Sequence, residues 1–443
     1  MNFYEYVSTK QGRIAELARI HPELGFTSLA YHIDMKWLYE AYRRTRKDGA
    51  VGVDGQTAEE YARDLEENLQ SLLERFKAGS YRVPPVRRAY IPKGNSEKEK
   101  RPIGVPAFED KVLQRAVVIV LEPVYEQDFL DCSYGFRPGR SAHNALDAIW
   151  KHLMSVGGGY IIDLDIRKFF DTMSHTHLRE ILKRRVRDGV LTRLISKWLK
   201  AGVWERGSIV YPEQGSPQGG VASPLLSNIY LHEVLDKWFS EQVKPRLKAE
   251  AYLVRFADDA VMIFAGESDA LRVMEVLPKR LSKYGLTVHS EKTRLIRFTR
   301  PKASKGSSGT ERQWEAFNFL GFTHYWGLSN KGNWVVKRKT QKSRFSRALK
   351  TVARWCKWNR HLPVQEQQRA LALKLRGHYN YYGITGNYGA LASFGFQVRK
   401  VWHKWLNRRT RGNSLSWEVF NRLLVRYPLP APKIGYSIFA AKL

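Results

Sequence analysis

The stretch Arg255-Phe256-Ala257-Asp258-Asp259-Ala260-Val261 sets two adjacent carboxylates between short apolar runs at residues 252–254 and 262–264. Such runs predict two strands of a buried hairpin with the carboxylates at its turn. Neighbouring carboxylates raise each other's pKa unless a cation neutralises them, and oxygen ligands favour Mg²⁺ or Mn²⁺. By itself, an Asp-Asp pair is equally typical of a polar hairpin tip.

A second acidic stretch decides between these interpretations. Residues 160–171 begin as an apolar strand that contains Asp163 and Asp165, which are two apart and therefore share one face. Only one of them needs to reach the hairpin turn to complete a metal site. An acidic strand end that faces an Asp-Asp hairpin is how palm-type polymerases hold two metals. One metal activates the attacking 3′-hydroxyl, and the other holds the leaving pyrophosphate.

The composition indicates a polyanionic partner. The 443 residues include 74 Lys and Arg against 43 Asp and Glu, a net charge of +31, which points to nucleic acid. Two cysteines exclude a disulfide framework and a four-cysteine zinc site. Apolar runs are too short for a membrane span, and residues 1–10 lack the apolar core of a signal peptide. We therefore expect a cytoplasmic protein of two or three domains.

Local patterns predict the elements in chain order. Residues 1–80 are expected to be helical, with a capping box formed by Thr57 and Glu60. Two basic strands follow at residues 82–106, and they suit either a hairpin that grips a triphosphate or an edge hairpin guarded by charge. The remaining predicted helices lie at 110–124, from residue 144 onward, and at 178–199. A Gly-rich loop at 214–228 runs into a helix and allows close backbone approach.

Seven short motifs follow one another between residues 50 and 325. They are Arg101–Pro106, Tyr134–Pro138, Asp165–Asp171, Ser216–Pro224, Phe256–Asp259, Gly285–Thr293 and Phe319–Phe322. In content and order they resemble those of group II intron reverse transcriptases, also called intron maturases. One departure is Phe256, where the family usually has tyrosine. The lost hydroxyl leaves the expected metal site intact.

The resemblance implies the catalytic residues. Asp165, Asp258 and Asp259 would hold two Mg²⁺ ions, with Mn²⁺ as a possible substitute, together with the backbone carbonyl of Ile166. Asp163 lies outside the matched motif and is expected to be structural.

The resemblance also implies residues that bind the incoming dNTP. Lys93 and Arg101 resemble the triphosphate clamp, and Gln218 resembles the residue that packs on the nucleotide. Lys292 resembles the general acid for the pyrophosphate, a role that requires it to lie close to the leaving group.

Phe170 lies five residues after Asp165, where the family places an aromatic wall beneath the sugar. A ring there would clash with a ribose 2′-hydroxyl and so select dNTPs over rNTPs. Phe170 could also be a core ring beside Phe169, and the two roles are compatible.

The C-terminal region is strongly basic. Residues 331–411 contain twenty Lys and Arg and one acid, Glu366. One face of a predicted helix is apolar, with Phe345, Leu349, Val352 and Cys356. The opposite face carries Arg347, Lys350, Arg354 and Lys357. The first face is expected to pack and the second to bind RNA phosphates. Interspersed tryptophans and tyrosines suit stacking on looped RNA, although core packing is favoured for most of them.

These observations predict an α+β fold of the right-hand polymerase type, with fingers, a palm built on an antiparallel sheet, and an α-helical thumb that is also the maturase region. The expected divisions are an N-terminal extension and the start of the fingers at 1–80, fingers and palm at 81–330, and thumb at 331–443. Many members of the family add a C-terminal nuclease with paired cysteines. Because the sequence shows no such segment, the endonuclease-lacking type is expected.

The predicted function is RNA-directed DNA synthesis combined with splicing and retrohoming of a group II intron. The partners would be the intron RNA, an RNA template with its DNA primer, target DNA and dNTPs, with no membrane, in a bacterial cytoplasmic ribonucleoprotein. Two alternatives remain open at this point. One is a related enzyme recruited to host defence or another cellular role. The other is a maturase that only binds RNA, and the intact carboxylates argue against it.

Overall fold

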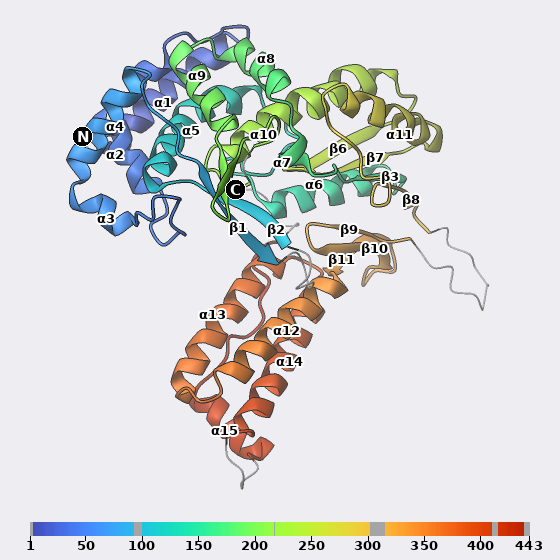
Figure 1. Ribbon diagram of the computed structural model, residues 1–443. Helices are drawn as coiled ribbons and strands as arrows, with labels where there is room; N and C mark the ends of the chain where they lie inside the picture. The colour runs from blue at the N-terminus through green and yellow to red at the C-terminus, as the bar shows by residue number, and fades with distance from the viewer. Residues whose placement is uncertain (1–2, 93–99, 217, 302–314, 410–414, 438–443) are drawn as a thin grey trace. The chain divides into compact units, whose positions relative to one another are not determined.

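The computed structural model describes residues 3–92, 100–216, 218–301, 315–409 and 415–437 (Figure 1). The chain divides into two compact units. Unit 1 comprises residues 1–145 and 160–295, and unit 2 comprises residues 146–159 and 296–443. Helices and antiparallel sheets occur in both, so the predicted mixture of α and β structure is confirmed.

Unit 1 begins with helices, as predicted. They are α1 (Phe3–Ile20), η1 (Leu29–His32), α2 (Met35–Arg44), α3 (Ala58–Arg63) and α4 (Leu65–Lys77). The capping box is present: the Glu60 amide donates to Thr57 Oγ1 at 3.1 Å, and the Thr57 amide donates to Glu60 Oε2 at 2.8 Å. Helix α5 (Phe108–Asp128) is longer than predicted and is buried along most of its length. It provides the surface on which α1 and α2 pack.

The helical prediction for 178–199 was wrong in one respect, because the structure contains two helices there. Helices α8 (His175–Arg185) and α9 (Gly189–Leu199) are separated by Asp188, which caps α9. Its Oδ1 accepts from the amides of Val190 and Leu191, at 2.9 and 3.1 Å, while Oδ2 accepts from the Ala30 amide at 2.7 Å. The second bond ties the break to η1.

Most strands of a four-stranded sheet belong to unit 1. Its order is β6 (Ala251–Phe256), β7 (Asp259–Phe264), β3 (Tyr160–Leu164) and β8 (Arg294–Arg297). The pairs β6–β7 and β3–β7 are antiparallel. Helix α11 (Glu267–Ser282) packs on β3 and β7. Helix α10 (Ser223–Leu231) continues into the π-helical turns η2 (His232–Asp236) and η3 (Trp238–Val243), and then into η4 (Lys244–Arg246).

A second sheet contains the basic hairpin, which is confirmed. Strand β1 (Val86–Pro92) pairs antiparallel with β2 (Lys100–Val105), with Pro92 opposite Lys100. The other edge of β1 pairs with β4 (Val203–Glu205), which forms its own hairpin with β5 (Ser208–Val210). The local pattern had not predicted this second hairpin.

Unit 2 combines a small sheet with helices. The sheet order is β11 (Trp334–Thr340), β10 (Phe322–Leu328) and β9 (Phe317–Phe319). Helices α12 (Lys342–Trp358), α13 (Val364–Tyr382) and α14 (Tyr388–Leu406) run alongside one another (Figure 1). Helix α15 (Trp417–Arg426) contributes Phe420 to the same core. Helix α6 (Ala142–Ser155) starts in unit 1 and supplies residues 146–155 to unit 2. Within the described residues, no helix combines the length and apolar character needed to cross a bilayer.

Candidate functional site

The predicted Asp-Asp hairpin is present. Phe256 pairs with Asp259, so Ala257 and Asp258 form a two-residue turn between β6 and β7. Ala257 adopts a left-handed conformation, with φ of 57°. Two-residue turns with positive φ match the twist of hairpin strands. Asp258 therefore sits at the tip of the hairpin, and Asp259 is the first residue of β7.

Strand β3 brings Asp165 to the same end of the sheet. Leu164, its last residue, lies opposite Ala260 of β7, so Asp165 follows directly beside the start of that strand. Segment 287–293 holds the backbone there. The Asp165 amide donates to Thr293 Oγ1 at 3.1 Å, and the Asp165 carbonyl accepts from the His289 amide at 2.8 Å. Strand β3 and the β6–β7 hairpin thus hold the three predicted catalytic carboxylates at the same end of the sheet.

Ile166 and Asp163 lie on either side of Asp165. Ile166 forms an isolated bridge with Val288 and is buried. The Asp163 carboxylate lies 3.7 Å from the Arg294 guanidinium. Burial raises the pKa of Asp163 to about 6, and the charge of Asp165 adds to this effect while Arg294 opposes it. This is the environment of a carboxylate partnered within the fold.

The electrostatics at the hairpin tip favour a cation. Burial raises the pKa of Asp258, and the nearby charge of Asp165 raises it further. Arg101 and Arg255 act in the opposite direction. A divalent cation near both carboxylates would remove the repulsion and stabilise their ionised forms.

A pocket of about 290 Å³ opens beside Asp165 and Asp259. It is lined by Asp163, Leu164, Asp165, Asp259, Glu291, Lys292 and Arg294. The Lys292 ammonium lies 3.4 Å from Asp165 Oδ2. Among the described residues, no three His, Cys, Asp or Glu side chains gather closely enough to enclose a metal on their own. The donor set nevertheless suits Mg²⁺, which proteins commonly bind through one or two carboxylates, water and substrate phosphates.

The loop that follows α5 packs directly against the hairpin tip. The Tyr134 amide donates to the Arg255 carbonyl at 2.8 Å, and the Arg255 amide donates to the Cys132 carbonyl at 2.7 Å. A Cβ atom added at Gly135 would lie 2.4 Å from the backbone nitrogen of Ala257, closer than any side chain tolerates. Glycine is therefore required for the loop to support the turn that carries Asp258.

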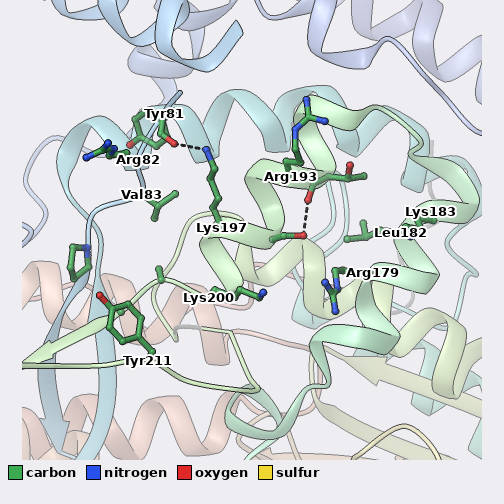
Figure 2. A pocket seen from close by; sticks show the side chains of 15 residues that line it. Tyr81, Arg82, Val83, Arg179, Leu182, Lys183, Arg193, Lys197, Lys200 and Tyr211 are labelled. Carbon is green, nitrogen blue, oxygen red and sulfur yellow. Dashed lines mark hydrogen bonds between the residues drawn. The ribbon is translucent and has the colours of Figure 1, made fainter. Parts of the chain in front are cut away.

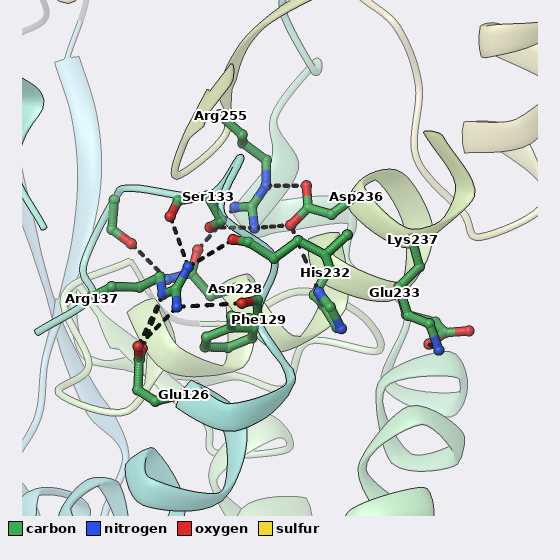
Figure 3. Close-up of polar contacts among 12 residues, drawn as sticks. Glu126, Phe129, Ser133, Arg137, Asn228, His232, Glu233, Asp236, Lys237 and Arg255 are labelled. Carbon is green, nitrogen blue, oxygen red and sulfur yellow. Dashed lines mark hydrogen bonds and ion pairs between the residues drawn. The ribbon is translucent and has the colours of Figure 1, made fainter. Parts of the chain in front are cut away.

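Arg255 supports the candidate site, and the sequence alone did not identify it. Its guanidinium is fully buried and pairs with the equally buried Asp236, with Nε 2.7 Å from Oδ1 (Figure 3). The same group donates to Ser133 Oγ at 2.7 Å, to Asn228 Oδ1 at 2.9 Å and to the Ala257 carbonyl at 3.0 Å. One side chain thus joins the loop, α10, η2 and the turn that carries Asp258. An arginine inside an apolar strand was the available signal.

Arg137 folds the supporting loop on itself. Its guanidinium pairs with Glu126 at 3.0 Å and donates to the carbonyls of Leu130 and Ser133, at 2.8 and 2.9 Å (Figure 3). Because these acceptors come from the end of α5 and from the loop, Arg137 fixes the path of residues 129–137 beneath the hairpin.

The Gly-rich loop lies between Phe170 and β2. The Ser216 amide donates to the Phe170 carbonyl at 2.7 Å, and the Gly104 amide donates to the Gln218 carbonyl at 2.7 Å. Gly219 has φ of 111°, and a Cβ there would lie 2.6 Å from the Gly104 carbonyl oxygen. The loop therefore places Gln218 beside the basic hairpin.

Two further predicted residues flank this loop. Phe170 is half-buried in the short helix α7 (Phe169–Thr172), and its ring centroid is 5.2 Å from that of Phe169 in an edge-to-face arrangement. Arg101 is exposed on β2, and its positive charge acts to lower the pKa of Asp258. Lys93 lies outside the described residues.

A comparison with protein families matches residues 91–324 to reverse transcriptase (RNA-dependent DNA polymerase). The chain belongs to the reverse transcriptase family. Members of this family generally use divalent metals, in agreement with the carboxylates that line the pocket beside Asp165 and Asp259.

Curated reverse transcriptase relatives point to the group II intron class, which confirms the family that the motifs predicted. Protein YkfC of Escherichia coli (strain K12) is 35% identical over 292 residues, covering 59% of this chain and 76% of YkfC. The group II intron-encoded protein LtrA of Lactococcus lactis subsp. cremoris is 34% identical over 275 residues. That alignment covers 59% of this chain and 45% of LtrA, so the chain spans less than half of that relative. Nuclear intron maturase 2 of Arabidopsis thaliana is 30% identical over 175 residues, covering 31% of this chain and 24% of the maturase.

In unit 2 of this reverse transcriptase, α12 has the two faces that its sequence predicted. Val352 and Cys356 are buried, and Phe345 and Leu349 pack against the same core. The basic residues lie elsewhere on the helix: Lys350, Arg354 and Lys357 are exposed, and Arg347 is half-buried. Of the aromatic side chains considered for stacking on RNA, Tyr379 and Trp402 are buried, whereas Trp358 is 65% exposed.

Proposed function

We propose that the chain is an RNA-directed DNA polymerase that adds dNTPs to a primer on an RNA template. The observation that carries this proposal is that Asp165, Asp258 and Asp259 lie at the same end of the sheet β6-β7-β3-β8. The pKa of Asp258 is raised there. Asp165, Asp258, Asp259 and the Ile166 carbonyl would hold two Mg²⁺ ions, or Mn²⁺ in their place. Such ions lower the pKa of a 3′-hydroxyl and neutralise the pyrophosphate that leaves.

The side chains around the carboxylates would position the nucleotide. Arg101 and Lys93 would bind the triphosphate, with charge-assisted hydrogen bonds that favour phosphate oxygens. Lys292 would give its proton to the pyrophosphate, and its distance of 3.4 Å from Asp165 supports this role. Gln218 would pack on the nucleotide, because its loop is anchored to the backbone of β2.

The fold divisions of the family are proposed for this chain as follows. Residues 1–80 would form the N-terminal extension and the start of the fingers, 81–330 the remaining fingers and the palm, and 331–443 the thumb and maturase region. The antiparallel sheet β6-β7-β3-β8 supports the palm assignment. The helices α12, α13 and α14 support the thumb assignment.

The second proposed activity is binding of the intron RNA in which the chain is encoded, to assist splicing and retrohoming into target DNA. The net charge of +31 supports a large polyanionic partner. The relatives named as a group II intron-encoded protein and an intron maturase support the identity of that partner. The resulting assembly would be a ribonucleoprotein of the bacterial cytoplasm, and Arg347, Lys350, Arg354 and Lys357 would contribute RNA contacts.

Primer extension tests the catalytic assignment. Asp165→Asn and Asp258→Asn should each abolish incorporation of dNTPs on an RNA template, because each removes a metal ligand while keeping the shape of the side chain. RNA affinity, measured in parallel, should stay close to that of the wild type. Asp163→Asn is the matched control and should retain measurable extension. Undiminished extension by either variant would defeat the assignment.

A further inference from the structure

A large basic pocket lies in unit 1 outside the candidate catalytic site. Its volume is about 710 Å³, and it is bounded by α8, α9, the segment that precedes β1 and Tyr211 just after β5 (Figure 2). None of its lining residues is shared with the pocket beside Asp165. The volume falls within the range of pockets that bind small molecules or single nucleotides.

The charge of this pocket is uniformly positive. Its lining contains six cationic side chains and no acid: Arg82, Arg179, Lys183, Arg193, Lys197 and Lys200. Among the described residues, no carboxylate lies within ion-pair distance of any of the six. The next two residues after Lys183 on α8 differ in this respect, because Arg184 pairs with Glu233 and Arg185 pairs with Asp128. Six like charges around one space repel each other, and an anion would relieve that repulsion.

One of the six cations links separate segments of the fold. Lys197 donates to the carbonyls of Gly79 and Tyr81, at 2.9 and 2.8 Å. By contrast, Arg179 donates within its own helix, to the His175 carbonyl at 3.3 Å, and the Lys200 ammonium points toward Arg179 (Figure 2). These two positive charges also act on His175. Burial lowers the pKa of His175, and Arg179 and Lys200 lower it further.

An aromatic ring completes the pocket. Tyr211 is 69% exposed although it lines the pocket, so one surface of the side chain remains available. Its position depends on Gly202, because a Cβ there would lie 2.4 Å from Cγ2 of Ile209 and 3.1 Å from Cε1 of Tyr211. Glycine thus allows β5 and the tyrosine to lie close to the end of α9.

We infer that this pocket binds a single nucleic-acid strand, with its phosphates on the cations and one base against Tyr211. Several cations around an accessible ring match the chemistry of single-strand sites, where aromatic stacking adds to phosphate contacts. A base-paired helix keeps its bases stacked inside, so it could not offer one to Tyr211. The site is separate from the polymerase chemistry and from the basic face of α12.

Fluorescence anisotropy with labelled oligouridine, at several salt concentrations, tests this inference. The test variant is Lys183→Gln with Arg193→Gln and Lys200→Gln, which spares the structural Lys197. The matched control replaces Arg272, Lys279 and Lys283, three exposed cations on or beside α11, in the same way. The test variant should bind roughly tenfold more weakly or worse, and its log–log salt slope should fall by about 2, since each lost single-strand phosphate contact removes about 0.7. The control should change neither quantity.

Variants of the ring separate stacking from charge. Tyr211→Ala should weaken oligouridine binding without changing the salt slope, whereas Tyr211→Phe should bind as the wild type does.

Oligothymidine of equal length shows whether the natural strand is RNA or DNA, since the strand that loses more affinity in the triple variant is the one recognised. Equal binding by the test and control triple variants would overturn the inference. So would an equal loss of affinity for an RNA duplex, which would make the pocket part of a general phosphate surface. Extension of a pre-annealed primer by the triple variant should persist, so failure here is distinguishable from failure of the catalytic assignment.

Discussion

The ionised side chain of Asp258 lowers the stability of the folded protein. Its pKa is raised by burial and by Asp165, so the folded chain holds the proton more tightly than the unfolded chain does. The free energy of unfolding therefore falls as pH rises from the ordinary carboxyl value through the raised one. At neutral pH the ionised carboxylate destabilises the metal-free protein.

Replacing this carboxylate should therefore stabilise the chain. We expect Asp258→Asn to raise the melting temperature of the metal-free protein at pH 7, and the gain should disappear at about pH 3, where Asp258 is protonated in both states. Thermal unfolding followed by circular dichroism across this range measures the effect. Asp48→Asn is the control of opposite sign, because Arg46 lowers the pKa of Asp48. A lower melting temperature for Asp258→Asn at pH 7 would contradict the electrostatic argument.

Phe170 allows a test of sugar selection. If its half-buried ring forms the floor beneath the incoming sugar, Phe170→Ala should raise incorporation of rNTPs relative to dNTPs, because the steric exclusion of the 2′-hydroxyl is lost. Competition assays with both nucleotides on one primer measure the ratio. Phe170→Tyr keeps the ring and should keep the preference. A ratio unchanged in Phe170→Ala would mean that the ring only packs against Phe169.

At the residue scale the sequence predicted acids better than it predicted their supports. A carboxylate beside an apolar strand is costly to bury, so the acids at 258–259 and in the stretch 160–171 indicated a bound cation. The family resemblance then selected Asp165 over Asp163. Arg255 directly precedes the Phe256–Asp259 motif, yet its role depends on Asp236, Asn228 and Ser133, which lie far from it in the sequence. Side-chain networks of this kind carry no periodic signal, so only the fold reveals them.

Among the elements, the contact between the loop at Gly135 and the β6–β7 turn should be sensitive to a single methyl group. Gly135→Ala would force the backbone of Ala257 to move and would displace Asp258 with it. We expect primer extension to fall by at least tenfold, because small misplacement of catalytic groups has large effects on rate. Steady-state extension at saturating dNTP measures this.

The matched control is Gly12→Ala in α1, where no atom lies within 4 Å of the added Cβ. It should leave activity intact and stabilise the helix by up to about 1 kcal/mol. Wild-type extension by Gly135→Ala would show that the turn does not depend on this loop.

Elements with strong local signals were predicted well, and elements defined by long-range pairing were not. The short apolar runs at 252–254 and 262–264 and the capping box at Thr57 identify their structures directly. The break between α8 and α9 was missed, although Asp188 followed by Gly189 is a helix-start signal. Strand β4 was missed for another reason: it has three residues, and it is stabilised by parallel pairing with β1, more than a hundred residues earlier in the chain.

For the whole molecule, the proposed division between polymerisation and RNA binding can be tested on α12. Neutralising Arg347, Lys350, Arg354 and Lys357 together should weaken affinity for structured intron RNA and flatten its salt dependence by about 0.7–0.9 log units per lost contact. Splicing assistance should fall with affinity. Extension of a short pre-annealed primer at saturating template should fall less, because phosphate contacts position RNA without taking part in the chemistry.

The matched control neutralises four cations on unit 1 that lie outside both pockets: Arg13, Arg19, Arg63 and Lys283. All four are exposed. A quadruple α12 variant that loses extension but keeps full affinity for structured RNA would indicate a clamp for the primer–template duplex instead.

The division into two units could not be read from the sequence, because unit 2 includes residues 146–159 from the middle of the chain. That arrangement has a consequence for biosynthesis. After residue 159 leaves the ribosome, the 136 residues of 160–295 must follow before the rest of unit 2 begins to emerge. At ordinary elongation rates this takes roughly 7 to 27 s. The apolar face of α6 therefore lacks its final neighbours during that interval. Slower translation of residues 160–295 would prolong the time in which chaperones or nascent RNA must cover this face.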